Sequence, residues 1–272
     1  MPAAPTDIIA EFYERYPYPL LSNLSRKHLE TYADQLLACA DLTTRQLEGK
    51  TILDGGCGTG EITCSMATHA KKVIGIDLSS TSITHAQSLA KKYALENITF
   101  IQQDILQLRM KEKFDLVTSF GVLHHTQNPT KGFEIISQRV KKNGILIIGF
   151  YHSLGGWKQR LQKWIVGMLA GKDPQKRLAF IEQFLGKKLG PHQRAFWMDR
   201  IANPRERYHS IPAMKRMFER NGFEIIGIQA HKPAFSIKDI ANPLDVFLFE
   251  SFLFVKGFRF AIIAGKNQNK RV

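Results

Sequence analysis

The chain has 272 residues, of which 44% are hydrophobic, so it is long enough for one large globular domain or two small ones. Its most apolar stretch, residues 246–265, is interrupted by Glu250, Lys256 and Arg259, and no segment is expected to span a bilayer. The first residues lack a basic region followed by an apolar core, and the three cysteines have neither disulfide-framework nor metal-ligand spacing. We therefore expect a cytoplasmic protein with reduced cysteines, no bound metal and no transmembrane segment.

The net charge of +14 is unevenly distributed along the chain. Residues 1–150 contain 16 Lys/Arg and 15 Asp/Glu, whereas residues 151–272 contain 22 and 9. Such an asymmetry favours an anionic partner, which could be RNA, an anionic lipid surface or an acidic substrate. A solvated basic face that only aids solubility explains the charge equally well.

Residues 1–48 have a helical pattern around Ile8, Ile9 and Phe12, followed by the sequence Tyr-Glu-Arg-Tyr-Pro-Tyr-Pro at 13–19. Two X-Pro steps there predict an extended segment, since proline disfavours a helical conformation in the residue before it. A second helix is predicted over about 29–42. The tyrosines either face a ligand or pack a proline-rich turn.

Residues 51–61 predict a strand, a ligand-binding loop and a helix. An apolar run, 51–53, leads to Asp54, and glycines then occupy every second position at 56, 58 and 60. Glycine lets the backbone turn sharply and approach a ligand, and a helix start offers free N–H groups. The nicotinamide pattern fails because its third glycine would fall on Glu61, and no Gly-Lys-Ser/Thr follows for a phosphate loop.

Four more apolar runs alternate with helical patterns, as a doubly wound parallel sheet requires. Residues 73–76 lead to Asp77, and residues 98–101 lead to Asp104 and Ile105. Residues 114–119 lead to Phe-Gly-Val-Leu-His-His at 120–125, and 144–150 form the fifth run.

This ordered set, over about residues 50–150, resembles the class I S-adenosylmethionine (SAM) dependent methyltransferases, although Asn143 replaces a proline of their pattern. The resemblance implies an α/β fold, a doubly wound, seven-stranded, mostly parallel Rossmann-like sheet. An N-terminal helical cap at 1–48 would precede the SAM-binding domain at 49–266. A substrate-recognition insertion, about 151–210, would follow strand five, and 267–272 would be a tail.

The resemblance also implies SAM as the cofactor and assigns a role to each loop at the strand ends. The methionine part of SAM would meet Asp54, Gly55, Gly56, Cys57, Gly58 and Gly60. The ribose would meet Asp77 and Leu78, the adenine would meet Asp104 and Ile105, and the place where methionine and substrate meet would be lined by Ser119, Phe120 and Gly121.

Methyl transfer from SAM is an in-line displacement, so alignment and water exclusion come first, and a base is needed only for a protonated acceptor. The candidates are His124, His125 and Tyr16, with Tyr13, Tyr18 and His152 as further ones. Packing, or a hydrogen bond to a residue that itself contacts the ligand, is the alternative role of the two histidines. Strand four ends in Ser-Phe-Gly-Val at 119–122, where RNA methyltransferases acting on amines often carry Asn/Asp-Pro-Pro-Tyr/Phe, which disfavours that reaction.

The C-terminal half contains the insertion and the predicted end of the sheet. Residues 151–210 contain 12 Lys/Arg and 4 Asp/Glu, and a helix over 157–169 places five apolar residues on one face. That face could pack on its own domain or lie on a membrane surface. The polar run 199–208 could form a pocket rim. A helix at 214–222 and strands at 223–228 and 259–264 would complete the sheet. The phenylalanines of 247–260 recur at period two, which suits strand cores or an apolar acceptor.

The sequence thus predicts a SAM-dependent methyltransferase acting on a small or medium acceptor. The basic C-terminal half would suit an anionic acceptor, and the phenylalanines would suit an apolar one. The alternatives are an RNA methyltransferase that uses the basic C-terminal half and a non-catalytic SAM-binding protein, because fold alone does not fix the reaction.

Overall fold

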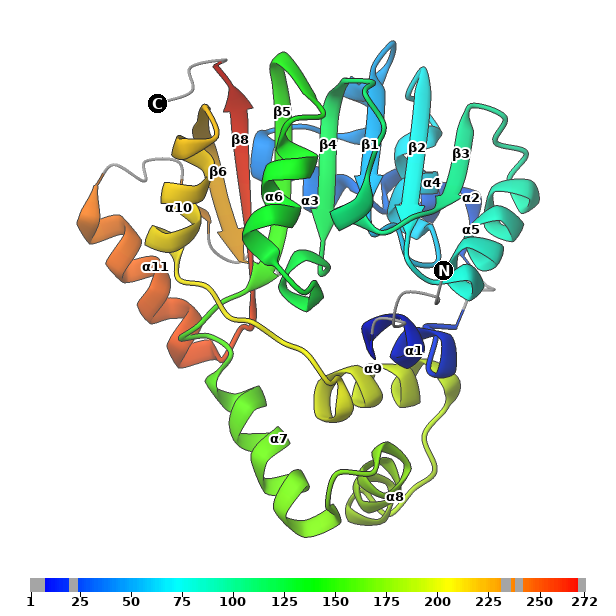
Figure 1. The fold of residues 1–272 in the computed structure, drawn as a ribbon, viewed down its shortest axis with the longest axis vertical. Helices are drawn as coiled ribbons and strands as arrows, with labels where there is room; N and C mark the ends of the chain where they lie inside the picture. The colour runs from blue at the N-terminus through cyan, green and yellow to red at the C-terminus, as the bar shows by residue number, and fades with distance from the viewer. Residues whose placement is uncertain (1–7, 20–23, 231–235, 238–241, 269–272) are drawn as a thin grey trace, which may run out of the picture.

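An eight-stranded sheet organises the chain (Figure 1). The computed structural model describes residues 8–19, 24–230, 236–237 and 242–268. The strand order is β3-β2-β1-β4-β5-β8-β6-β7; β1 to β5 are parallel, and β8 is antiparallel to both β5 and β6. The strands are β1 Thr51–Gly55, β2 Lys72–Asp77, β3 Ile98–Gln102, β4 Phe114–Phe120, β5 Val140–Tyr151, β6 Phe223–Ala230, β7 Ser236–Ile237 and β8 Phe260–Asn267.

Helices cover both faces of the sheet, because successive strand residues are apolar on both sides and both faces must be buried. Leu53 faces a core that includes residues of α6 (Pro129–Ser137), α10 (Ile211–Arg220) and α11 (Pro243–Lys256). Its neighbour Ile52 faces a second core, with residues of α3 (Asp34–Leu37) and α4 (Glu61–Ala67) and of the 3₁₀ turn η2 (Thr44–Leu47). A third core joins α5 (Ser80–Lys92) to α2 (Arg26–Thr31).

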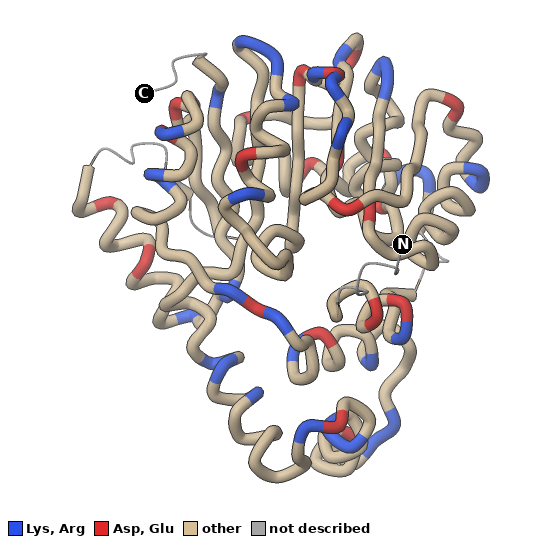
Figure 2. Tube along the Cα trace, viewed as in Figure 1, with Lys and Arg blue, Asp and Glu red and all other residues tan. Residues whose placement is uncertain are grey.

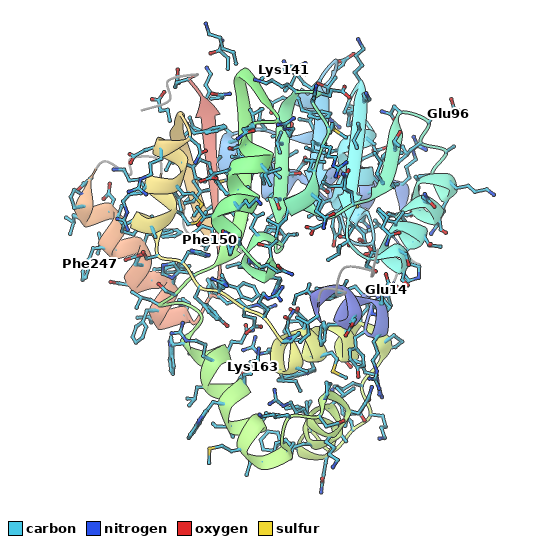
Figure 3. All side chains as sticks on the ribbon, viewed as in Figure 1. Glu14, Glu96, Lys141, Phe150, Lys163 and Phe247 are labelled. Atoms are coloured by element: carbon cyan, nitrogen blue, oxygen red, sulfur yellow. The ribbon has the colours of Figure 1, made fainter. Side chains whose placement is uncertain are left out.

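The insertion after β5 forms its own helical layer beyond the carboxyl ends of the parallel strands (Figure 1). It consists of α7 (Trp157–Ala170), α8 (Pro174–Phe184) and α9 (Pro191–Ala202), and α1 (Ile8–Arg15) packs against it. Glu14 of α1, labelled in Figure 3, accepts hydrogen bonds from the Ser80 N–H and the Thr81 hydroxyl. The N-terminal segment therefore bridges the insertion and the sheet domain.

The predicted sheet is confirmed, with differences at its edges. All seven expected strands form, and the two-residue β7 adds an eighth next to β6. The helix predicted over 29–42 is instead divided into α2, α3 and the 3₁₀ turn η1 (Ala38–Ala40). Asn267, the first residue of the predicted tail, lies in β8, where its side-chain amide donates to the carbonyls of Val140 and Lys141. Residues 269–272 lie outside the described residues.

The strand interpretation of the phenylalanine-rich segment is wrong for residues 243–256, which form α11. Local helix signals outweigh the period-two pattern there. The Asn242 side chain caps the first turn by accepting from the Leu244 N–H, and Pro243 occupies the first helical position. Gly257 ends the helix in the left-handed region, with φ of 68°.

Candidate active site

A cavity of about 460 Å³ lies between the carboxyl ends of the parallel strands and the helical layer of the insertion. One wall comes from the loops after β1, β2, β3 and β4. The opposite wall comes from α1, α9 and the end of the extended segment around Tyr18. Ligands of open α/β sheets bind at this end of the strands. The predicted cofactor loops and part of the insertion therefore share one cavity.

The loop after β1 has a backbone that only glycine can form at two points. Gly56 has φ of 83°, and a Cβ there would lie 2.2 Å from Cγ2 of Val122. Gly60 has φ of 88°, and a Cβ there would lie 2.7 Å from the Cβ of Ala86. The N–H groups of Gly56 and Cys57 donate to the Ile76 carbonyl at 2.7 and 2.9 Å, which fixes the loop against β2.

Asp77, at the end of β2, lies in the cavity wall that is formed by the loops after β1, β2, β3 and β4. Its Oδ2 accepts from the Gly58 N–H and its Oδ1 from the Ser79 N–H, both at 2.9 Å. Burial raises the pKa of Asp77, although these backbone donors act in the opposite direction. A carboxylate has about four acceptor positions, so Asp77 keeps acceptor capacity for ligand hydroxyls in the cavity that it lines.

Other acidic and polar residues of this wall also hold the scaffold. Asp54 lines the cavity but accepts from the hydroxyls of Thr63 and Thr118 at 2.6 and 2.7 Å, which joins β1 to α4 and β4. Ser119 is buried and donates to the Gly55 carbonyl at 2.7 Å. Asp104 lines the cavity and caps the 3₁₀ turn that follows it.

The insertion contributes Asp199, a buried carboxylate with several partners. Oδ1 accepts from the Tyr13 hydroxyl at 2.9 Å and from the Asn203 amide at 3.0 Å. Oδ2 accepts from the Tyr151 hydroxyl at 3.2 Å and from the Arg259 guanidinium at 3.3 Å. Burial raises the pKa of Asp199, but the neighbouring His125 ring in its charged form, the Arg259 guanidinium and the hydrogen bonds from Asn203 and Tyr13 outweigh it and hold the pKa below its usual range. Asp199 thus stays ionised and joins α1, α9, β5 and β8.

The three catalytic candidates occupy different places. His125 lines the cavity, and its Nδ1 lies 2.6 Å from the Arg205 carbonyl oxygen. His124 is fully buried and lies outside the cavity lining. Its ring stacks on that of Tyr151, with 3.7 Å between the ring centroids, and neither of its ring nitrogens has a hydrogen-bond partner within the described residues. Tyr16 also lies outside the lining, because its ring packs on Phe12 in the core of the insertion.

The structure brings most, but not all, of the predicted cofactor residues to the cavity. Those in its lining are Asp54, Gly56, Cys57, Gly58, Asp77, Leu78, Asp104, Ile105, Phe120 and Gly121. Gly55, Gly60 and Ser119 stand behind the lining and shape the loops.

Sequence reasoning missed the lining residues Tyr151, His192 and Arg259, which belong to no recognisable motif, whereas Phe260 is one of the phenylalanines that suited an apolar acceptor. Asp199 opens the polar run expected at a pocket rim, but it belongs to helix α9 rather than to a turn.

This arrangement defines a class of protein: an enzyme fold that holds a nucleoside-type cofactor at the ends of β1 and β2. The residues fit SAM, because the Asp77 carboxylate could accept from ribose hydroxyls and the side chains of Leu78 and Ile105 would offer apolar walls for a base. At Gly58, moreover, no atom lies within 4 Å of the position that a Cβ would take.

Comparison with known proteins establishes the family. The sequence model of the methyltransferase domain family matches residues 46–183, about half of the chain. The chain therefore belongs to this family of methyltransferase domains, and its fold is that of solved SAM-dependent methyltransferases.

Two relatives illustrate the sequence similarity. An uncharacterised protein of Synechococcus is 26% identical over 234 residues, 81% of this chain and 50% of the relative. The ubiquinone biosynthesis O-methyltransferase of Pasteurella multocida is 28% identical over 167 residues, 56% of this chain and 65% of the relative. The matches thus span half to two thirds of these relatives.

Solved structures show the same fold at low identity. PKMT2 of Rickettsia typhi, in complex with S-adenosylhomocysteine (SAH), aligns with a TM-score of 0.64 and 19% identity over 93% of this chain and 55% of its own. Magnesium protoporphyrin IX methyltransferase of Synechocystis PCC 6803, with bound SAM, aligns with a TM-score of 0.52 and 14% identity over 96% and 92%.

Proposed function

We propose that this protein transfers the methyl group of SAM to a hydroxyl group of an aromatic small molecule, and that His125 accepts the hydroxyl proton. When bound, SAM supplies an electrophilic methyl group on a sulfonium. The glycine loop and Asp77 would hold the cofactor. The protein's own residues would align the acceptor and keep water away.

The observation that carries this proposal is the position of His125, which lines the cavity with its Nδ1 against the Arg205 carbonyl. A carbonyl oxygen can only accept a hydrogen bond, so the 2.6 Å contact with Arg205 places the ring proton on Nδ1. Burial lowers the pKa of His125, against the opposing charge of Asp199, so the ring is neutral near pH 7. Nε2 then keeps a lone pair in a residue that lines the cavity, which suits a general base.

The aromatic acceptor is inferred from the wall around His125. Tyr13, Tyr151, Phe120 and Phe260 line the cavity, and rings of this kind favour stacked or edge-on contacts with a planar ligand. The relatives named ubiquinone biosynthesis O-methyltransferase, among them those of Pasteurella multocida and Coxiella burnetii, support an oxygen acceptor.

The test uses SAM with a radiolabelled methyl group and four acceptor panels: phenols and catechols, aromatic amines, carboxylic acids and total RNA. We expect label in the phenol and catechol panel. His125→Gln should lower the turnover of the phenol and catechol acceptors by about a hundredfold, which is the usual contribution of a general base. The affinity for SAM, measured by calorimetry, should be unchanged. His28→Gln, at an exposed position outside the cavity, is the matched control.

The pH profile gives a second readout. Because the pKa of His125 is lowered, wild-type turnover should hold down to about pH 6.5, the value of a free imidazole, and fall only below it. Loss of that acid limb in His125→Gln supports the role; a limb unchanged by the substitution contradicts it.

RNA methylation is the second candidate, favoured by the 22 Lys/Arg against 9 Asp/Glu of residues 151–272. Label in the RNA panel, with binding that weakens steeply with salt, would replace the leading proposal. SAM binding without label in any panel would favour a non-catalytic role.

A further inference from the structure

Helix α7 exposes the apolar face that the sequence predicted, rather than burying it. Its residues Leu161, Trp164, Ile165, Met168 and Leu169 are between 40% and 67% exposed. They follow the i, i+3, i+4, i+7, i+8 spacing of one helical stripe. Within α7 only Gln159 and Val166 are buried. The stripe is therefore not needed for the core of the insertion.

Helix α11 has a matching apolar stripe, and the two stripes are joined. Leu244, Phe247, Leu248, Phe254 and Val255 are between 47% and 68% exposed, although this helix also buries other residues in the sheet core. The indole N–H of Trp157 donates to the Phe254 carbonyl at 2.9 Å, and the two rings lie 5.6 Å apart. Figure 1 shows α11 and α7 following each other along one edge of the molecule, and Figure 3 shows Phe247 on the outer side of α11. We name these two stripes together the apolar edge.

Basic residues accompany the α7 part of the apolar edge, whereas α11 carries Asp245, Glu250 and Lys256. Helix α7 contains Lys158, Arg160 and Lys163 and no acidic residue. Three of the four acids of the insertion form ion pairs: Glu182 with Lys188 and Arg194, Glu206 with Lys163 of α7, and Asp199 with Arg259, which lies outside the insertion. Figure 2 shows Lys and Arg but no acidic residue along α7, and residues of both signs in the region of α8 and along α11. A basic rim beside exposed Trp, Leu and Met, as on α7, is the composition of an interfacial helix.

We propose that the apolar edge is a docking surface for an anionic lipid bilayer, on which the protein lies peripherally. No helix in the described ranges is long and apolar enough to cross a membrane. The apolar side chains would enter the boundary between headgroups and acyl chains, and the basic rim would contact anionic headgroups. A second copy of the chain fits less well, because a self-complementary contact would bring two cationic rims together.

The apolar edge is connected, through the packing of the insertion, to the cavity wall formed by α1, α9 and Tyr18, here called the acceptor wall. Helix α9, which carries Asp199, packs with α7 and α8 in one core. Docking through α7 would therefore place the cavity close to the bilayer, where apolar acceptors accumulate. The docking stands independently of the reaction proposed above, since it is measured by lipid binding rather than by methyl transfer.

The test is sedimentation of the full chain with vesicles, either of phosphatidylcholine alone or with about one third phosphatidylglycerol. We expect binding to the anionic vesicles that weakens with salt. The double variant W164E/M168E should bind at least about tenfold more weakly, since it places two charges in the apolar stripe. I8E, a 49% exposed position of α1 outside the apolar edge, is the matched control and should bind as the wild type does.

A second variant keeps the test independent of α7 folding. L244E/F247E changes α11 alone and should also weaken vesicle binding by about tenfold. SAM affinity measured by calorimetry should be unchanged in all three variants, which shows that they are folded. Failure of the wild type to sediment with anionic vesicles overturns the proposal, as does unchanged sedimentation of both double variants. A wild-type dimer in light scattering that W164E/M168E makes monomeric would overturn it in favour of a second copy.

Discussion

The sheet domain and the insertion bury their apolar residues differently. In the sheet domain, strand residues such as Ile52, Leu53 and Ile147 are 0% exposed, and residues 1–150 are nearly neutral in charge. In the insertion, Trp164 and Met168 are 62% and 67% exposed, and 12 basic residues face 4 acidic ones. A domain that is complete in itself needs no such exposure, whereas a surface that meets a partner does. The exposed apolar residues of α7, together with those of α11 at the edge of the sheet domain, support the proposal that this side of the molecule meets a partner, while the buried sheet positions the cavity.

The largest expected effect is on the link between these two regions. Asp199→Ala leaves the Arg259 guanidinium, 12% exposed at its side chain, without its carboxylate. Breaking a buried pair in this way should cost about 3–5 kcal/mol in the free energy of unfolding, measured in urea. Glu112→Ala is the control: its pair with Lys72 is more than 40% exposed on both sides, and its loss should cost about 1 kcal/mol or less. Equal costs for the two variants would mean that Asp199 does not join the regions.

Asp77→Ala should act on the sheet domain alone. Removing the carboxylate takes away the expected ribose acceptor and the partner of the Gly58 N–H. We expect SAM to bind at least about tenfold more weakly in calorimetry, about 1.4 kcal/mol. Glu96→Ala, on the exposed loop before β3 labelled in Figure 3, should leave the affinity unchanged. An unchanged affinity for Asp77→Ala would reject the ribose assignment.

The smallest expected effect concerns His124, where the two regions meet. Burial lowers its pKa well below that of a free imidazole, so below about pH 6.5 the unfolded chain takes up a proton that the folded chain refuses. Stability therefore falls as the pH drops, by about 1.4 kcal/mol between about pH 7.5 and 5.5 for this group. His124→Phe should reduce the loss in that window by about this amount, measured by urea unfolding at both ends. An identical loss in wild type and variant would contradict a buried, neutral His124.

The sheet was predictable because local patterns determine it. Apolar runs ending in Asp54 and Asp77, with glycines between them, specify strand ends that topology then brings together. The acceptor wall was not predictable in the same way, because it depends on distant contacts. Tyr13 and Asp199 are hydrogen-bonded although 186 positions separate them in the sequence, and no local sequence pattern at either residue predicts this contact. Helix α11 was misread because alternating phenylalanines suit a strand, and only the Asn-Pro start and the glycine stop mark it as a helix.

The measurement that most directly tests whether the cofactor binds to the sheet domain rather than to the insertion is hydrogen exchange of the full chain with and without SAH. We predict slower exchange of the backbone amides in the 55–61 loop and at 77–79 and 103–106, with α7 and α8 unchanged. That result would place the cofactor in the sheet domain and leave the insertion for the acceptor and the lipid surface. Protection confined to the insertion, or none at the glycine loop while SAH is bound, would contradict this account of the site.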